Sequence, residues 1–259
     1  MILTHHNNLN QVINRSRSYI FRFLLRLSLL ILYKGCFHIA VSKGVANDIK
    51  NITQQKSIGI IPYGFDFKFL DRLKFLKKPI KIVSAGRFDQ QKDFTNLINA
   101  FSYLNEKNKK NCSLTLIGDG QDYHRLLTHI NNKNLNNTIK LVKWKNNVNK
   151  YFRKFDLFIF SSLYEGLPNV IIEAMSQGLP IISTDTPFGP SEILDNGKYG
   201  ILVPMEDPEA MAGAMYKLLT NKKKYNYYAK QSLERAKYFS LGKMLKAYKK
   251  VILEALKIN

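Results

Sequence analysis

The sequence is poor in the residues that most often form disulfides and transition-metal sites. Its 259 residues include only 2 cysteines, Cys36 and Cys112, which stand in no metal-binding motif and at no recognisable partner spacing. The 5 histidines are scattered, apart from the adjacent His5 and His6, and no pair has metal-ligand spacing. This scarcity argues against a disulfide framework and fits a reducing compartment.

Acidic residues are also scarce relative to basic ones. The chain has 19 Asp and Glu against 40 Lys and Arg, which gives a formal net charge of +21. Nucleic acid, an anionic membrane surface or an anionic ligand would each complement this charge, and a bias toward Lys and Asn would explain it equally well. Because no nucleic-acid-binding motif accompanies the charge, we expect no nucleic-acid partner.

The sequence has no uncharged apolar run long enough to cross a membrane. Its most apolar stretch, residues 15–33, is interrupted by Arg22 and Arg26, and the uncharged part is shorter than the ~20 residues of a spanning helix. The stretch starts too far into the chain and lacks the cleavage site of a signal peptide. We predict a helix packed on a sheet with its arginines at the rim, with contact to an anionic bilayer as an additional role.

The clearest local pattern is a strand, loop, helix and strand over residues 155–184. Residues 155–160 form a short apolar run rich in β formers, which predicts a strand buried on both faces. A polar turn follows, and Pro168 is expected at the first position of a helix that ends at Gly178. Residues 181–184 are the next strand. This is the repeating unit of an open α/β sheet.

Two carboxylates lie where this unit would bind a ligand. Glu165 is in the loop at the carboxyl end of the strand, and Glu173 is one to two turns into the helix. Ligands of open α/β sheets bind at this rim, where helix N-terminal amides meet anions. Amides near residues 167–170 are placed to hold a phosphate or a sugar hydroxyl, with both carboxylates accepting hydrogen bonds from hydroxyls. The site suits a sugar nucleotide, and the alternative is simple capping and solvation.

Strand and helix patterns alternate on both sides of this unit, which predicts a doubly wound parallel sheet. The expected strands are at residues 1–4, 37–41, 57–61, 80–85, 113–117 and 138–142. The expected helices are at residues 43–50, 93–107, 121–131, 148–154, 208–219, 222–238 and 241–256. Residues 68–79 are polar and basic and are predicted to be a linker between two domains.

A second candidate site follows the strand at residues 80–85. Gly86 allows the backbone to leave the strand sharply, and Arg87 and Lys92 precede a predicted helix N-terminus. Arg87 is suited to bidentate binding of a diphosphate and Lys92 to a point-charge contact. The residues alone favour a solvated basic loop.

The stretch from Glu165 to Glu173 reads Glu-Gly-Leu-Pro-Asn-Val-Ile-Ile-Glu and resembles the Glu-x7-Glu motif of retaining family 4 glycosyltransferases. The flanking Ser-x-x-Glu and Glu-Ala-Met-x-x-Gly-Leu-Pro match as well. The resemblance implies a GT-B fold of α/β class. It implies an incomplete amino-terminal Rossmann-like domain at residues 1–78, a Rossmann-like donor domain at 79–238, and a terminal helix at 239–259 crossing back to the first domain.

The resemblance also implies roles for individual residues. Arg87 and Lys92 would neutralise a leaving diphosphate, and Glu165 would orient sugar hydroxyls beside them; these three are the expected catalytic residues. Glu173 would hold the ribose. The other expected donor-binding residues are Gly86, Trp144, Gly166, Leu167, Pro168, Asn169 and Gly189. No metal or other cofactor is expected.

The activity implied is transfer of a hexose or N-acetylhexosamine from a UDP-linked nucleotide sugar, with retention. The expected acceptor is a growing surface glycan, such as lipopolysaccharide, capsule or another lipid-linked saccharide, with the protein cytoplasmic and peripheral on the inner face of the plasma membrane. The alternative is a truncated, non-catalytic remnant or subunit that binds nucleotide sugar and needs a partner chain for turnover, because the family's opening strands and Gly-rich loop are missing. His5 or His6 would match an acceptor-facing histidine of the family, but adjacent surface histidines are the preferred interpretation.

Overall fold

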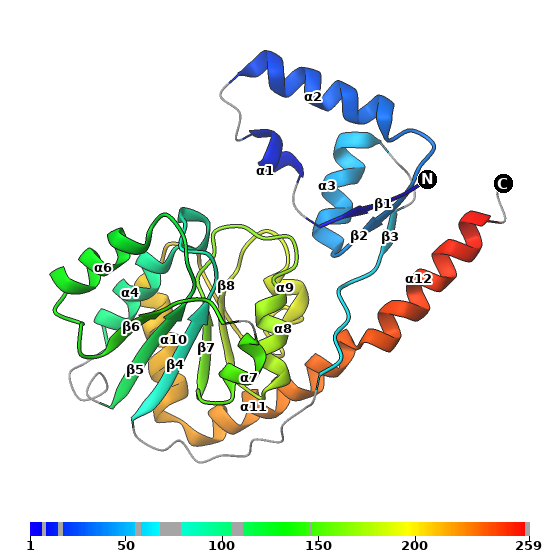
Figure 1. Ribbon diagram of the computed structural model, residues 1–259. Coiled ribbons are helices and arrows are strands. Elements are labelled where there is room, and N and C mark those ends of the chain that lie inside the picture. Colours follow the sequence, from blue (N-terminus) through cyan, green and yellow to red (C-terminus); the bar gives the residue numbers. More distant parts are fainter. Residues whose placement is uncertain are drawn as a thin grey trace.

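The computed structural model describes residues 1–6, 9–14, 18–54, 58–67, 79–104, 111–145 and 147–256, and these form two parallel sheets (Figure 1). The larger sheet has the strand order β6-β5-β4-β7-β8-β9. Its strands are β4 (Ile80–Ala85), β5 (Cys112–Ile117), β6 (Ile139–Val142), β7 (Leu157–Phe160), β8 (Ile181–Thr184) and β9 (Ile201–Val203). The smaller sheet pairs β1 (Ile2–His5), β2 (Phe37–Ala40) and β3 (Ile58–Ile60). The predicted α/β class with parallel sheets is confirmed.

Helices cover both faces of the larger sheet because its strands carry apolar side chains on both sides. In β4, Ile80 and Ile82 belong to one buried cluster, whereas Val83 and Ala85 belong to the other, as the two-residue period of a strand requires. The first cluster includes residues of α4 (Phe94–Ser102), α6 (Tyr123–Asn132) and α10 (Pro208–Thr220). The second includes residues of α7 (Val148–Phe152), α8 (Asn169–Ser176), α9 (Pro190–Ile193) and α11 (Lys222–Ala236).

The central unit has the predicted elements with small shifts in their ends. All four residues of β7 are buried, as expected for a strand covered on both faces, and β8 has the predicted bounds. The prediction that Pro168 is the first helical residue is wrong, because Pro168 is the N-cap of α8 and its ψ of 99° is extended rather than helical. The fixed φ of proline suits a cap as well as a first turn, so the sequence alone does not separate the two positions.

The chain returns to the smaller sheet through its last helix, α12 (Leu241–Leu256), which has the predicted bounds. The segment after β3 meets the start of this helix, where Phe65 donates its N–H to the Phe239 carbonyl at 2.9 Å and Leu241 donates to the Phe65 carbonyl at 3.0 Å. The predicted linker lies outside the described residues except for Pro79. The three-part domain division therefore stays a prediction.

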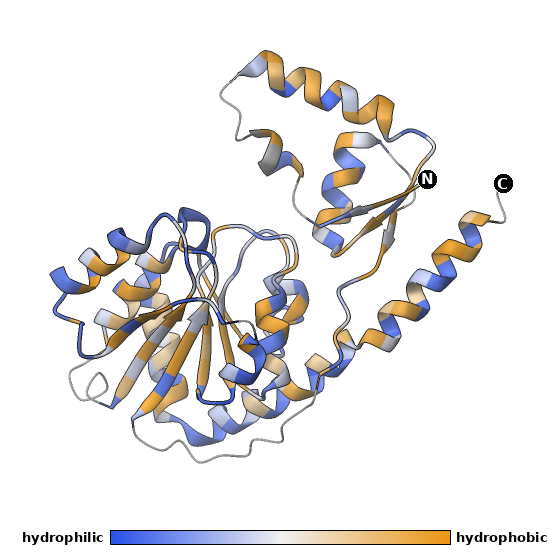
Figure 2. Cartoon of the chain, viewed as in Figure 1, coloured by the Kyte–Doolittle hydropathy of each residue, from blue (hydrophilic) through white to orange (hydrophobic). Residues whose placement is uncertain are grey.

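The apolar helix predicted at residues 15–33 forms as α2 (Tyr19–Leu32), but the prediction that it packs on a sheet is wrong. It lies against α1 (Leu9–Asn14) and α3 (Lys43–Thr53), and α3 stands between it and the strands (Figure 1). None of its side chains is buried, and most of the helix is coloured as hydrophobic in Figure 2. The exposed apolar residues of α2 are Tyr19, Ile20, Phe21, Phe23, Leu24, Leu27, Ile31 and Leu32. In the described ranges, no helix has the length and hydropathy of a membrane span.

The interpretation of His5 and His6 as surface histidines is wrong for His5, which lies at the end of β1 and is only 6% exposed. His38 Nε2 lies 3.0 Å from the Tyr33 carbonyl, which can only accept, so this nitrogen carries the proton. His38 Nδ1 then accepts from His5 Nε2 at 3.0 Å. Burial, followed by the charges of His38 and His6, lowers the pKa of His5 from 6.5 to about 4. His6 is exposed and contacts Tyr63 Oη at 2.5 Å.

This histidine makes stability depend on pH in a defined direction. Between pH 6.5 and 4 the unfolded chain protonates His5 while the folded chain does not, so the unfolded state binds more protons. The contribution of His5 to the free energy of unfolding should therefore fall by about 2 to 3 kcal/mol as the pH decreases through this window. Urea unfolding at several pH values measures the slope. His5→Gln should flatten it, whereas the exposed control His124→Gln should not; equal slopes in all three proteins would contradict the assignment.

Candidate functional site

The site lies where the strand order of the larger sheet reverses. The chain goes from β4 outward to β5 and β6 and then returns to place β7 on the other side of β4. Loops leaving the carboxyl ends of β4 and β7 consequently diverge, which opens a crevice at this edge of the sheet. The first loop contains the short 3₁₀-helix η1 (Gln90–Lys92), and the second leads into α8.

A cavity of about 640 Å³ occupies this crevice, and we call it the rim cavity. Nine of the predicted site residues line it: Gly86, Arg87, Lys92, Trp144, Glu165, Leu167, Pro168, Asn169 and Glu173. Three further residues line it: Val170, which belongs to the amide range 167–170 expected to meet a ligand, and Ala85 and Asp119, which were not among the predicted site residues. Asp119 could have been found from the Gly-Asp-Gly turn that follows β5, because this turn ends at the same edge of the sheet.

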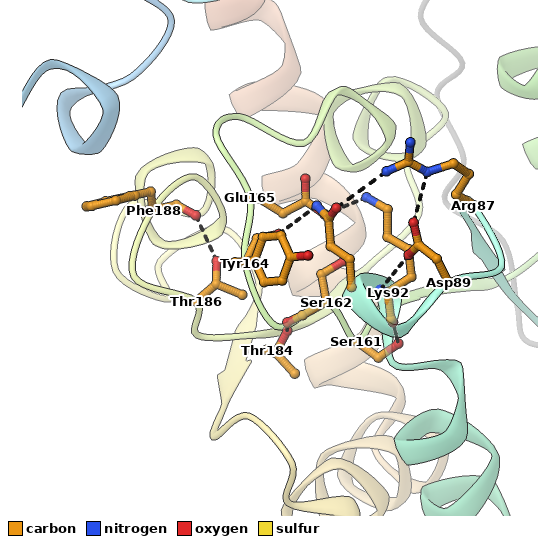
Figure 3. A network of polar contacts seen from close by, with 11 residues as sticks. Arg87, Asp89, Lys92, Ser161, Ser162, Tyr164, Glu165, Thr184, Thr186 and Phe188 are labelled. Atoms are coloured by element: carbon orange, nitrogen blue, oxygen red, sulfur yellow. Dashed lines mark hydrogen bonds and ion pairs between the residues drawn. The ribbon is translucent and has the colours of Figure 1, made fainter. Parts of the chain in front are cut away.

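An ion pair between Lys92 and Glu165 joins the two loops at the wall of the cavity (Figure 3). Lys92 Nζ lies 2.5 Å from Glu165 Oε1, and the side chains are 16% and 10% exposed. Two hydrogen bonds reinforce the contact, because Ser161 Oγ donates to the Lys92 carbonyl at 2.7 Å and Gln91 Nε2 donates to the Tyr164 carbonyl at 2.9 Å. The relative position of cation and carboxylate is therefore fixed before any ligand binds.

Arg87 is held more loosely at the outer edge of the cavity. Its side chain is 69% exposed, and its Nε lies 2.9 Å from Asp89 Oδ2 (Figure 3). Such exposed pairs contribute at most about 1 kcal/mol, so the guanidinium can turn toward an incoming anion at little energetic cost. Arg87 also lines a neighbouring cavity of about 410 Å³, which places it between two open spaces.

Glu173 lies on the face of α8 that borders the cavity. Burial raises the pKa of its carboxyl group above the usual value. Among the described residues, no cation forms an ion pair with this carboxylate. A ligand that donates hydroxyl hydrogens would supply the missing hydrogen bonds.

Two predicted site residues, Gly166 and Gly189, support the cavity wall rather than line it. Gly189 has a φ of +92°, and a Cβ there would lie 2.7 Å from Pro168 Cδ and 2.9 Å from the Gly166 carbonyl oxygen. Only glycine allows this approach without displacing the loop. Gly118 has a similar role below Gly86, because a Cβ would lie 2.0 Å from the Gly86 carbonyl oxygen.

The family model "Glycosyl transferases group 1" matches residues 67–235. An uncharacterized glycosyltransferase of Methanocaldococcus jannaschii is 35% identical over 205 residues, which cover 68% of this chain and 50% of the relative. An N-acetylgalactosamine-N,N'-diacetylbacillosaminyl-diphospho-undecaprenol 4-alpha-N-acetylgalactosaminyltransferase of Campylobacter jejuni is 30% identical, over 66% of this chain and 46% of the relative. The chain spans about half the length of these curated relatives.

The pneumococcal O-GlcNAc transferase GtfA, solved in complex with UDP and GlcNAc, has a similar fold. The TM-score is 0.79 at 20% identity, with 98% of this chain and 52% of that chain covered. At this identity the likeness concerns the fold alone. It supports the GT-B type of α/β fold expected from the sequence.

Proposed function

The chain belongs to the glycosyl transferases group 1 family, and on this premise we propose that the rim cavity binds a UDP-linked sugar. The protein transfers the sugar, a hexose or N-acetylhexosamine, to a growing surface glycan with retention of configuration, as a family 4-like enzyme. One observation carries the donor assignment: cations from the loop after β4 and carboxylates from the β7–α8 segment meet in one cavity at the switch point.

Arg87 and Lys92 act on the diphosphate of the donor. Charge accumulates on this group as its bond to the sugar breaks, and fixed cations stabilise that charge. Lys92 is already positioned by Glu165, whereas Arg87 leaves Asp89 to bind the diphosphate bidentately. The free amides of α8 near Leu167 and Asn169 add donors from the opposite side.

The two carboxylates act on hydroxyl groups of the donor. Glu165 uses one oxygen to accept from Lys92, which leaves the other to orient sugar hydroxyls. Glu173 accepts hydrogen bonds from the ribose. The proposal contains no metal step, because the diphosphate charge is met by Arg87 and Lys92. Retention rests on the resemblance of the Glu165–Glu173 segment to the family motif.

A transfer assay tests this function. The purified chain is incubated with UDP-glucose, UDP-N-acetylglucosamine or UDP-N-acetylgalactosamine and an undecaprenyl-diphosphate-linked saccharide, whose class is suggested by the name of the Campylobacter relative. Mass spectrometry should detect one added sugar and an equal amount of UDP, and NMR should show the anomeric configuration of the donor. Glu165→Gln should lose transfer while it retains UDP binding.

A second candidate function is a nucleotide-sugar-binding subunit that needs another polypeptide for turnover. This chain covers 50% and 46% of the length of the two relatives, and the second candidate assigns the remaining part of such a protein to another polypeptide. UDP binding without transfer to any of these acceptors would contradict the first function and support the second.

We also propose that α2 holds the protein on an anionic membrane at the cytoplasmic face. No acidic residue precedes Asp48 in the sequence, and exposed apolar side chains cover α2 beside Arg26. Phe23→Asp/Leu27→Asp should weaken binding to phosphatidylglycerol-containing vesicles by about tenfold or more in flotation assays. Tyr227→Asp, which changes an exposed aromatic residue on α11, should leave binding unchanged. Equal binding to purely zwitterionic vesicles, or no effect of the double substitution, would contradict the role of α2.

A further inference from the structure

A single carboxylate connects the two sheets close to the rim cavity. Glu192 belongs to α9, which follows β8 of the larger sheet, and α3 follows β2 of the smaller sheet. Glu192 Oε2 accepts from the backbone N–H of Lys43 at 2.7 Å, and Oε1 accepts from that of Gly44 at 2.8 Å. These amides begin α3 and have no partner within the helix, so the carboxylate both satisfies them and meets the positive end of the helix dipole.

Two further contacts converge on the same turn of α3. Ser42 Oγ accepts from the Val45 N–H at 3.1 Å and donates to the Gly166 carbonyl at 3.1 Å, so one buried hydroxyl joins the helix cap to the cavity wall. At Gly44, an added Cβ would lie 2.1 Å from Phe188 Cδ1 and 2.7 Å from Phe188 Cβ. The first turn of α3 therefore approaches the loop before α9 more closely than any residue with a side chain would allow.

On the side of the larger sheet, hydrogen bonds hold α9 in place. Arg235 donates to the Glu192 carbonyl at 2.6 Å and to the Ile193 carbonyl at 2.7 Å, which fixes α9 from behind. Gly189 lies against Gly166 and Pro168 in the cavity wall. The first turn of α3 is therefore bonded to the cavity wall at Gly166, the residue that follows Glu165.

We propose that Glu192 is a positioning residue that holds the smaller sheet over the rim cavity through its contact with the start of α3, and we call this contact the latch. Gly44 permits the close approach because it has no side chain. The latch itself is independent of the reaction. Its consequence, that it places the acceptor-side unit over the donor, rests on the proposed function. The segments joined at Phe65, Phe239 and Leu241 form another connection between the sheets, farther from the rim cavity, about which the smaller sheet turns when the latch opens.

The test compares Glu192→Ala and Gly44→Ala with wild type and with the control Glu209→Ala, which removes an exposed acid from the first turn of α10. Both test variants should increase the radius of gyration in small-angle X-ray scattering without nucleotide. They should also accelerate hydrogen exchange of the amides at Lys43 and Gly44 by about tenfold or more. Gly44→Ala leaves the Glu192 carboxylate in place and favours the helical conformation of α3. If Glu192 only capped α3, this variant would change neither the radius of gyration nor the exchange rates.

A second substitution that relieves the overlap at Gly44 provides a further test. Gly44→Ala/Phe188→Ala removes the overlapping ring and should restore the wild-type radius of gyration and exchange. Wild-type values in Glu192→Ala and Gly44→Ala would overturn the latch. Because these readouts need no ligand, they remain decisive if the wild type shows no transferase activity. If transfer is observed, Glu192→Ala and Gly44→Ala should each lower the transfer rate by about tenfold or more. Their UDP affinity should change by less than about twofold, because Arg87 and Lys92 belong to the larger sheet.

Discussion

Replacing Arg87 and Lys92 together by alanine should abolish measurable UDP binding, with a loss of about 1,000-fold in affinity. The two side chains are the cations of the rim cavity that lie beside the N-terminus of α8. A hydrogen bond to a charged group contributes about 1.5 to 3 kcal/mol, so the loss of both removes about 4 kcal/mol of binding free energy. Calorimetric titration with UDP measures the affinity, and circular dichroism confirms that the variant is folded.

A matched control separates local from general charge effects. Lys81→Ala/Lys140→Ala removes two exposed cations from β4 and β6 and should bind UDP like the wild type at moderate salt. Near-native UDP affinity in the Arg87/Lys92 double variant would contradict the assignment of the diphosphate site.

Breaking the Lys92–Glu165 pair from one side should destabilise the fold strongly. Lys92→Met leaves the Glu165 carboxylate, 10% exposed, without its cation, and Glu165→Gln leaves Lys92 without its anion. Each single substitution should lower the free energy of unfolding by about 3 kcal/mol, because an uncompensated buried charge remains. In Lys92→Met/Glu165→Gln both charges are gone, so the combined loss should be clearly smaller than the sum.

Urea unfolding of the four proteins completes this double-mutant cycle. The exposed pair Lys237–Glu234, with an N–O distance of 2.8 Å and side chains 55% and 53% exposed, is the control and should show a coupling below about 1 kcal/mol. Additive losses at Lys92 and Glu165 would contradict a coupled pair. The two loops would then be held by uncharged hydrogen bonds such as those of Ser161 and Gln91.

The parts of the fold that the sequence predicts well depend on local patterns. The run Leu157–Phe160 is apolar at every position, so it predicts a strand covered on both faces, and Gly178 with Pro180 ends the following helix and starts β8. The β7–α8 side of the rim cavity follows from these patterns, because the carboxyl ends of parallel strands meet at one edge of the sheet. Arg87, Lys92 and Trp144 were expected there from the resemblance to the glycosyltransferase family, since the residues alone favoured a solvated basic loop at Arg87 and Lys92.

The features that the sequence does not predict depend on partners far along the chain. Burial of His5 follows from its contact with His38, and nothing near His5 in the sequence indicates this contact. The apolar pattern of α2 predicts a helix with an apolar surface. It does not show that α3 packs on the smaller sheet in its place. In the sequence, Glu192 is an ordinary acidic residue in the first turn of a short helix. Its partners, the amides of Gly44 and Lys43, are 148 and 149 positions away, so no local pattern indicates them.

We propose that the rim cavity of this chain is a working nucleotide-sugar site. The most direct test is calorimetric titration of the purified protein with UDP, UDP-glucose and UDP-N-acetylgalactosamine, repeated on Glu173→Ala. We predict saturable binding by the wild type and a loss of about 10- to 100-fold in the variant, because the carboxylate that accepts from the ribose is gone. No binding by the wild type, or equal binding by both proteins, would contradict the claim.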